Sequence, residues 1–292
     1  MRVLLSGYFS FDGNVSTAGD LLAGDVVAGW LERAGVPYDV ARSAKYGGGV
    51  DWERADPADY SHVVWVCGPM TRGPKQTALR ERFRDCRLVA VDVSLLDELG
   101  GWNPYDAVVE RDSAGTARPD ISFLARGELP PVVGLCVIER QREYGERGDH
   151  GAAVEALRRL IDSRPMAVVK VDTRIKPRRP GRRTPGEVEA LLGRMDVVLT
   201  NRLHGLVLAL KHGVPVVAID SVRGGAKLHR QAQALGWPAV VGIESLDDER
   251  LTRAFEFCLT ADARRAAIEA RDRAVQAAAA VERDFLAALG LS

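Results

Sequence analysis

Arg202 and His204 are the two side chains whose types and spacing point most directly to chemistry. A histidine side chain titrates near neutral pH, so His204 can give or take a proton during a reaction. A guanidinium held beside a buried strand needs an anion or a carbonyl as its partner, which makes Arg202 a candidate anion ligand. The pair therefore indicates a site for a small anionic substrate. Structural salt bridging of the arginine and a buried core position for the histidine stay open as alternatives.

The residues around this pair predict the elements that hold it. Residues 197–199 form an apolar strand, a turn follows at 200–201, and the next leucines belong to a helix that stops at His212-Gly213. Residues 214–219 then indicate a second buried strand, so the sheet is parallel. Ligands of open parallel sheets bind at the carboxyl ends of the strands, beside helix N-termini. Lys227, which follows one strand and one loop later, is expected in a loop at the same edge.

Length and composition favour a globular protein of two domains. The chain has 292 residues, of which 46% are hydrophobic and 27% are charged, and its formal net charge is zero. Global charge therefore indicates neither nucleic acid nor an anionic membrane as partner. No apolar run approaches the ~18 residues that span a bilayer, and the first residues indicate a short strand rather than a signal peptide. We expect a cytoplasmic protein; peripheral membrane contact and the oligomeric state stay open.

The cysteines do not indicate a metal site. Cys67, Cys136 and Cys258 lie in apolar runs and Cys86 lies among charged residues, and none forms a CxxC or another metal-type spacing. We expect most of them to be buried as small apolar side chains.

Alternating strands and helices predict an α/β fold with two Rossmann-like domains that face each other across a cleft. The N-terminal domain is expected over residues 1–125. A stretch rich in proline and glycine then leads into a C-terminal domain over 126–262. A long alanine-rich helix follows over 263–292, and it could cross back onto the first domain.

Two further segments carry side chains that could contact a substrate. A strand over 2–7, a loop and a helix that opens at Gly19-Asp20 form a unit typical of anion binding, although the loop could merely connect strand to helix. Residues 174–184, RIKPRRPGRRT, contain six basic residues and two prolines. They are either a solvated loop or a contact to a phosphate-bearing acceptor through residues such as Arg174 and Arg178. Nucleic acid is disfavoured because no aromatic residues interleave the charges.

The sequence resembles the polysaccharide pyruvyl transferase family in several blocks. NRLHG at 201–205 and ALKHGVPVVA at 209–218 are similar to the most specific block of that family, and Lys227 ahead of a Leu-Gly-Trp segment fits the same pattern. Weaker similarity covers Asn14 with the Gly-Asp pair that follows it, the ERDS segment at 110–113, and Asp120 with Phe123. The resemblance runs from near residue 1 to about residue 260.

This resemblance implies a GT-B-like architecture and a transferase that moves the pyruvyl group of phosphoenolpyruvate onto sugar hydroxyls as a ketal, with release of phosphate. Arg202, Lys227 and Arg111 would hold the carboxylate or the phosphate of the donor. His204 would move protons between donor, acceptor hydroxyl and leaving phosphate. Phosphoenolpyruvate is the donor substrate, and neither a cofactor nor a metal ion is expected.

The acceptor side is where the sequence departs from the family. The loop 13–20, which holds Asn14 and Asp20, is longer than usual, and Cys67-Gly68-Pro69-Met70 replaces a glycine-rich element. Both segments lie in the domain expected to bind the acceptor, which would be a saccharide or a glycan intermediate. Two alternatives to a pyruvyl transferase stay open: a GT-B-type glycosyltransferase that uses a nucleotide sugar, and a non-catalytic anion-binding relative.

Overall fold

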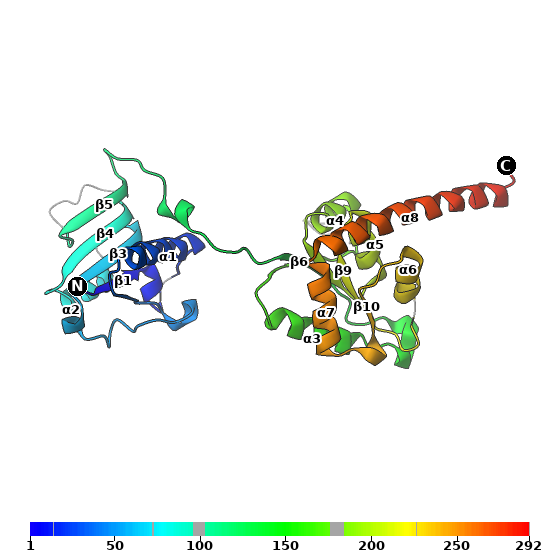
Figure 1. Cartoon of the computed structure of the whole chain (residues 1–292), viewed down its shortest axis with the longest axis horizontal. Helices are drawn as coiled ribbons and strands as arrows, with labels where there is room; N and C mark the ends of the chain where they lie inside the picture. The colour runs from blue at the N-terminus through cyan, green and yellow to red at the C-terminus, as the bar shows by residue number, and fades with distance from the viewer. Residues whose placement is uncertain (14, 72, 96–102, 176–183, 226, 292) are drawn as a thin grey trace. The chain divides into compact units, whose positions relative to one another are not determined.

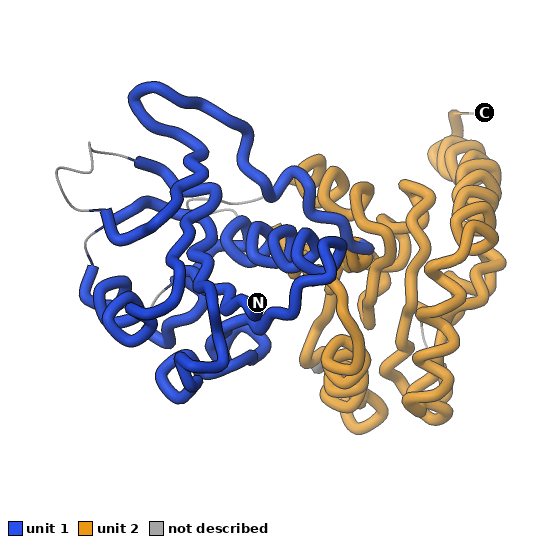
Figure 2. Tube along the Cα trace, turned by 60° about the vertical axis from the view of Figure 1, so that its left-hand side comes forward, with its two compact units in different colours: residues 1–128 blue, residues 129–292 orange. Residues whose placement is uncertain are grey.

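The computed structural model divides into two compact units, unit 1 over residues 1–128 and unit 2 over residues 129–292 (Figure 2). The structure describes residues 1–13, 15–71, 73–95, 103–175, 184–225 and 227–291. Each unit contains one parallel sheet of five strands with helices packed against it. Each unit also buries apolar core residues of its own.

Unit 1 is built on a sheet with the strand order β2-β1-β3-β4-β5, in which all neighbouring strands are parallel. Short 3-10 turns connect its main elements. The strands and α-helices are β1 (Val3–Gly7), α1 (Ala18–Arg33), β2 (Tyr38–Val40), β3 (His62–Pro69), α2 (Pro74–Arg82), β4 (Arg87–Ser94) and β5 (Ala107–Asp112). The 3-10 helices are η1 (Tyr8–Ser10), η2 (Ala44–Tyr46), η3 (Pro57–Asp59) and η4 (Ile121–Leu124).

The sheet of unit 1 has an apolar core on each face. Two consecutive residues of β1 belong to the cores on opposite faces. Leu4 belongs to a cluster with Trp65 and with Leu79 of α2. Its neighbour Leu5 belongs to a separate cluster with Val27 of α1. Strand side chains alternate between faces, so a strand covered on both sides is apolar throughout.

Unit 2 has the strand order β10-β9-β8-β6-β7, again with parallel neighbours. Its main elements are β6 (Val132–Cys136), α3 (His150–Asp162), β7 (Ala167–Lys170), α4 (Pro185–Leu192), β8 (Val197–Thr200), α5 (Leu203–Lys211), β9 (Val216–Asp220), α6 (Lys227–Leu235), β10 (Val240–Gly242), α7 (Asp248–Cys258) and α8 (Ala261–Ala288). The 3-10 helices η5 (Arg142–Arg147) and η6 (Ile243–Ser245) complete the unit.

The helices of unit 2 pack against one another as well as against the sheet. Helix α3 packs against α7, whereas α5 packs against α4, α6 and α8 (Figure 1). Right-handed crossovers from β6 to β7 and from β7 back to β8 put α3 and α4 on opposite faces of the sheet. The first half of α8 contributes Ala263, Ala267 and Ala270 to the core at helical spacing. A return of α8 to unit 1 stays a prediction.

The α/β fold predicted from the sequence is confirmed, because two parallel five-stranded sheets form from the predicted strands. Lys227 differs from its expected place, since it is the first residue of α6 rather than part of the preceding loop. The cleft between the units stays a prediction. In the part of the chain that the structure describes, no helix has the length and apolarity needed to cross a bilayer.

Candidate functional site

The turn from β8 into α5 carries Arg202 and His204 at the carboxyl edge of the unit 2 sheet. Thr200, the last residue of β8, is fully buried. Its hydroxyl donates to the carbonyl of Cys136 at the end of β6 (2.6 Å) and accepts from the amide of Arg202 (3.0 Å). Arg202 is the N-cap of α5, and His204 lies in its first turn. One buried hydroxyl therefore anchors the turn that carries both candidate side chains.

Asn201 fastens this turn to the loop after β6. Its side-chain oxygen accepts from the amide of Ile138, and its side-chain nitrogen donates to the Ile138 carbonyl, both at 2.8 Å. Asn201 is 4% exposed, and unpaired polar groups at such burial are costly. Asn201 is therefore a positioning residue for two strand ends.

Gly205 must lack a side chain for this turn to form. A Cβ atom at this position would lie 2.1 Å from Thr200 Oγ1 and 3.2 Å from Cys136 Sγ. We expect Gly205→Ala to lower the free energy of unfolding by about 1–3 kcal/mol, since overpacking must displace the buried threonine. Urea unfolding measures this loss.

Gly186→Ala is the matched control for Gly205→Ala. Gly186 also lies in the first turn of a unit 2 helix, but its added Cβ would come no closer than 4.0 Å to Thr184 Oγ1. This variant should be neutral or stabilised by about 0.5–1 kcal/mol, the usual gain from replacing a helical glycine. Equal destabilisation of both variants would contradict the role of Gly205.

Arg202 and Arg174 share the carboxylate of Asp172, which follows β7. Arg174 contacts it through Nε (3.1 Å to Oδ1) and Nη2 (3.0 Å to Oδ2), and Arg202 Nη1 lies 3.5 Å from Oδ1. The hydrogen bonds from Arg174 are the main cause that lowers the pKa of Asp172. The Arg202 side chain is 14% exposed, and among the described residues Asp172 is its only ion-pair partner. A guanidinium has five donors, so Arg202 retains donors for a further anion.

His204 and the start of α5 complete this part of the site. The side chain of His204 is exposed and has no hydrogen-bond partner among the described residues. The N-cap side chain makes no hydrogen bond to the helix, because arginine offers no acceptor. Uncapped amides and the helix dipole attract anions. Arg202, the helix start and an exposed imidazole are together suited to bind an anion and exchange a proton with it.

Lys227 lies at the same edge of the sheet, after the strand next to β8. Its Nζ is 3.5 Å from Glu143 Oε1 and 5.5 Å from the centroid of the Tyr144 ring. Desolvation acts to lower the pKa of Lys227, but Tyr144 and Glu143 outweigh it and raise the pKa. Lys227 is therefore a stable cation beside the strand ends.

The segment between β6 and α3 borders this edge, and sequence reasoning did not single it out. It lines a pocket of about 450 Å³ together with the start of α3; the lining residues are Glu139, Arg140, Gln141, Gly145, Gly148, Asp149, His150 and Gly151. The amide of Asp149 donates to the Ser221 carbonyl (2.8 Å), and Arg223 Nη2 lies 3.3 Å from Asp149 Oδ2. The pocket wall is thus fixed to the loop that leads to Lys227.

His150 is the titratable residue of this pocket that is most completely buried. It is 4% exposed, its Nε2 lies 3.1 Å from Gln141 Oε1, and its ring stacks on Tyr144 at 6.3 Å between centroids. The sequence signal that could have found it is Asp149, an N-cap residue directly before an amphipathic helix. The aromatic ring of Tyr144 therefore links His150 to the cation of Lys227.

Acidification is expected to destabilise unit 2 in part through His150. Burial lowers the pKa of this imidazole, although Glu143 and Asp149 act in the opposite direction. The fold favours the neutral ring, so this stabilisation is present above the unfolded pKa of about 6.5 and is lost as the pH falls through the lowered folded pKa. A His150→Gln variant should show a flatter pH dependence of its urea midpoint below neutrality. An unchanged dependence would show that other groups control it.

The remaining candidate residues lie in unit 1 or outside the described residues. Arg111 is the residue before the last in β5, where its Nη1 contacts Asp120 Oδ2 (2.6 Å) and its Nε contacts Asp112 Oδ2 (2.7 Å). Asp20 forms a capping box at the start of α1, with Oδ2 accepting from the Thr17 amide (2.7 Å). Both side chains thus have structural partners. The other two predicted residues, Asn14 and Arg178, lie outside the described residues.

Unit 2 therefore brings Arg202, His204, Arg174 and Lys227 to one edge of one sheet. Two of them, Arg174 and Arg202, are linked through the carboxylate of Asp172, which both contact. All four cysteines are buried and free, including Cys86, which lies among charged residues in the sequence.

The chain matches one family model, and its similarity to solved structures is low. Residues 143–221, less than half of the chain, match the model described as polysaccharide pyruvyl transferase, which confirms the family resemblance over that segment. The matched segment includes Arg202 and His204, and its first residue, Glu143, contacts Lys227. The N-terminal blocks of the resemblance lie outside the matched segment and stay predictions. No curated protein matches the chain significantly.

Two solved structures illustrate the structural similarity. CalG4, the calicheamicin glycosyltransferase, is 14% identical over 98% of both chains with a TM-score of 0.36. The spinosyn forosaminyltransferase SpnP is 14% identical over 94% of both chains with a TM-score of 0.34. At these values the fold class rests on the strand orders of the two sheets.

Proposed function

We propose that this chain, whose residues 143–221 match the polysaccharide pyruvyl transferase family, transfers the pyruvyl group of phosphoenolpyruvate to a saccharide or glycan-intermediate acceptor. The observation that carries the proposal is that the matched segment contains the turn from β8 into α5. That turn holds a partly buried guanidinium, uncapped helix amides and an exposed imidazole. We propose the cytoplasm as the compartment.

The reaction needs proton transfer and stabilisation of anions. Two acceptor hydroxyls add to the second carbon of phosphoenolpyruvate, and the bond from that carbon to the phosphate oxygen breaks. The two hydroxyls release two protons. One proton is taken up by the methylene carbon, which becomes a methyl group, and the other leaves with the phosphate. A group that both accepts and donates protons is required, and we assign this role to His204.

Donor binding is assigned to the cations at the edge of the unit 2 sheet. Arg202 would hold the carboxylate or phosphate through donors that Asp172 does not use, and Lys227 would add a second cation. Fixed donors of this kind stabilise negative charge that develops on a leaving group. Arg111 is the third proposed donor ligand. Its guanidinium already contacts two carboxylates closely, so it has fewer N–H donors left for the substrate.

Acceptor binding is proposed for unit 1 and the basic segment after β7. Asn14, Asp20, Arg174 and Arg178 are the residues assigned to it. Arg174 is held by Asp172, and Asp20 is held by the cap of α1. Both would therefore act from fixed positions.

The test is release of phosphate from phosphoenolpyruvate in the presence of a pool of oligosaccharides. The proposal expects phosphate release that depends on the acceptor, together with a new ketal methyl signal in the proton NMR spectrum of the product. Thermal stabilisation by phosphoenolpyruvate should accompany it, since a ligand at 100 times its dissociation constant adds about 2.7 kcal/mol. Stabilisation by UDP or GDP alone, with no effect of phosphoenolpyruvate, would favour a nucleotide-sugar glycosyltransferase instead.

A further inference from the structure

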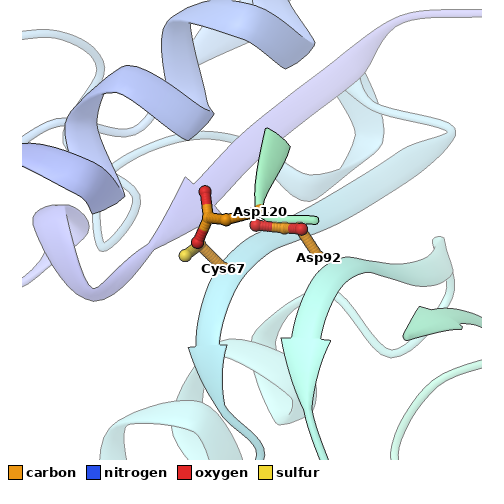
Figure 3. Close-up of side chains that lie close together, drawn as sticks. All are labelled: Cys67, Asp92 and Asp120. Atoms are coloured by element: carbon orange, nitrogen blue, oxygen red, sulfur yellow. The ribbon is translucent and has the colours of Figure 1, made fainter. Parts of the chain in front are cut away.

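The carboxyl edge of the unit 1 sheet has an occupied half and an open half. At the ends of β3 and β4, Arg111 Nη1 lies 2.6 Å from Asp120 Oδ2 and 3.7 Å from Asp92 Oδ2. The same nitrogen lies 3.7 Å from Cys67 Sγ. Figure 3 shows the three side chains that this guanidinium joins. Past the ends of β1 and β2, the edge instead holds a pocket of about 530 Å³.

Three segments that follow neighbouring strands line this pocket. They are residues 10–13 after β1, residues 42–44 and 48–53 after β2, and the first half of α2 after β3. In the strand order β2-β1-β3, the chain runs outward from β1 to β2 and then returns past β1 to β3. Such a reversal opens a crevice at the carboxyl ends of the strands, where ligands of doubly wound sheets bind. The volume lies in the range of small-molecule sites.

Close contacts fix the backbone around the pocket. Gly49 packs against β2 so closely that a Cβ atom there would lie 2.4 Å from the carbonyl oxygen of Val40. The buried hydroxyl of Ser43 donates to a carboxylate oxygen of Asp12 and so ties the loop after β2 to the loop after β1. Lys45 Nζ donates to the carbonyl of the same aspartate (2.8 Å). The walls are therefore preformed, which lowers the ordering cost of binding.

The pocket combines aromatic rings with exposed carboxylates. The rings of Phe11 and Trp52 meet edge to face with 5.4 Å between their centroids, and both residues line the pocket. Asp51 and Glu53, which flank Trp52 in the sequence, are exposed and line it as well. An aromatic ring attracts the weakly positive C–H groups of a sugar, and carboxylates accept hydrogen bonds from its hydroxyls. This combination is suited to a saccharide.

The charges of the lining disfavour a ligand that bears phosphate. Three carboxylates and two cations line the pocket: Asp12, Asp51, Glu53, Arg42 and Lys75. Arg42 is already paired, since its Nη2 lies 2.5 Å from Asp25 Oδ1. The negative charge that is left over repels phosphates and nucleotides, whereas uncharged hydroxyl groups meet no such penalty.

We propose that this pocket binds an uncharged sugar unit, and that in the proposed transfer reaction this unit belongs to the acceptor. The cavity, its aromatic rings and its carboxylates carry the first statement, whereas the second rests on the proposed function. Glu53 and Asp51 would accept hydrogen bonds from sugar hydroxyls, and the ring of Trp52 would pack on the C–H groups. The pocket thus adds defined residues of unit 1 to the proposed acceptor contacts Asn14 and Asp20.

The test uses the full chain and saturation-transfer NMR. The probes are the methyl glycosides of glucose, galactose, mannose and N-acetylglucosamine, with inorganic phosphate and UDP as anionic competitors. We expect the ring protons of at least one glycoside to receive saturation, and the same glycoside to change the tryptophan fluorescence. Trp52→Phe should remove the fluorescence change. Phosphate and UDP should not displace the glycoside.

Two pairs of variants locate the binding. Glu53→Gln should raise the Kd of the glycoside by at least about 10-fold, because it removes a charged hydrogen-bond acceptor. Glu81→Gln, which changes an exposed carboxylate outside the pocket lining, should leave the Kd unchanged. Ala78→Trp fills the pocket from an exposed position of α2 and should abolish binding, whereas Arg80→Trp at an exposed position outside the lining should not. Circular dichroism establishes that each variant folds.

The possible failures separate the sugar site from the transfer reaction. Binding of no glycoside, displacement by phosphate or UDP, or binding that survives both Glu53→Gln and Ala78→Trp would overturn the sugar site. If a glycoside binds but Ala78→Trp leaves acceptor-dependent phosphate release unchanged, the bound sugar is not the acceptor. If the wild type releases no phosphate with any acceptor, the proposed transfer is contradicted and the sugar site stands.

Discussion

His204→Ala is expected to reduce acceptor-dependent phosphate release from phosphoenolpyruvate by about 10²–10⁴-fold, the usual contribution of a general acid–base group. The same substitution should leave the free energy of unfolding nearly unchanged, because the side chain is exposed on the first turn of α5. Exposed substitutions away from special contacts usually stay within about 0.5 kcal/mol. Initial rates at saturating donor, together with urea unfolding, measure both quantities.

His212→Ala provides the control from the other end of the same helix. His212 is the C-cap of α5, and its Nε2 contacts Glu189 Oε2 at 3.0 Å. This variant changes the same residue type and removes a surface contact worth at most about 1 kcal/mol, yet it should keep full activity. If both variants were equally active, His204 would not be the proton-transfer group. If both were equally inactive, the loss would report damage to α5.

The architecture was predictable because both sheets are buried on both faces. Apolar runs such as 197–199 and 214–219 predicted β8 and β9, and the turns that flank the intervening helix followed from Thr200-Asn201 and Gly213. The start of α6 was harder to predict from the sequence. It depends on Asp220 Oδ2, which accepts from the amide of His229 (3.0 Å) and so stabilises the first turn across a glycine-rich loop.

The pocket at the start of α3 was not predictable, because its wall is fixed by contacts remote in the sequence. His150 and Tyr144 lie in or beside an irregular segment with no periodic pattern, and the antiparallel bridge between Gly148 and Val222 sets their place. The left-handed backbones of Cys67 and Asp92, with φ values of 64° and 58°, could not be predicted for another reason. No residue pattern predicts left-handed backbones at non-glycine positions, since they persist only where the surrounding structure enforces them.

Arg202→Ala should lower kcat/KM for phosphoenolpyruvate by about 10²–10³-fold, the range seen when one donor to a developing anion is removed. Arg202→Lys should fall between this variant and the wild type, because a lysine keeps the charge but not the planar fork of donors. Arg194→Ala is the control, since Arg194 is exposed and donates to the carbonyl of Ala190 near the end of α4. It should leave kcat/KM unchanged.

Asp172 distinguishes donor binding by Arg202 from simple salt bridging. Arg202 makes one contact of 3.5 Å with this carboxylate, whereas Arg174 Nε and Nη2 hold it at 3.0–3.2 Å. Loss of Arg202 therefore leaves Asp172 paired, and the free energy of unfolding should change by less than about 1 kcal/mol. If Arg202 only balanced that carboxylate, Asp172→Asn would impair the reaction as much as Arg202→Ala does. Donor binding predicts the reverse, because removing the carboxylate releases further guanidinium donors to the substrate and lowers the KM for phosphoenolpyruvate.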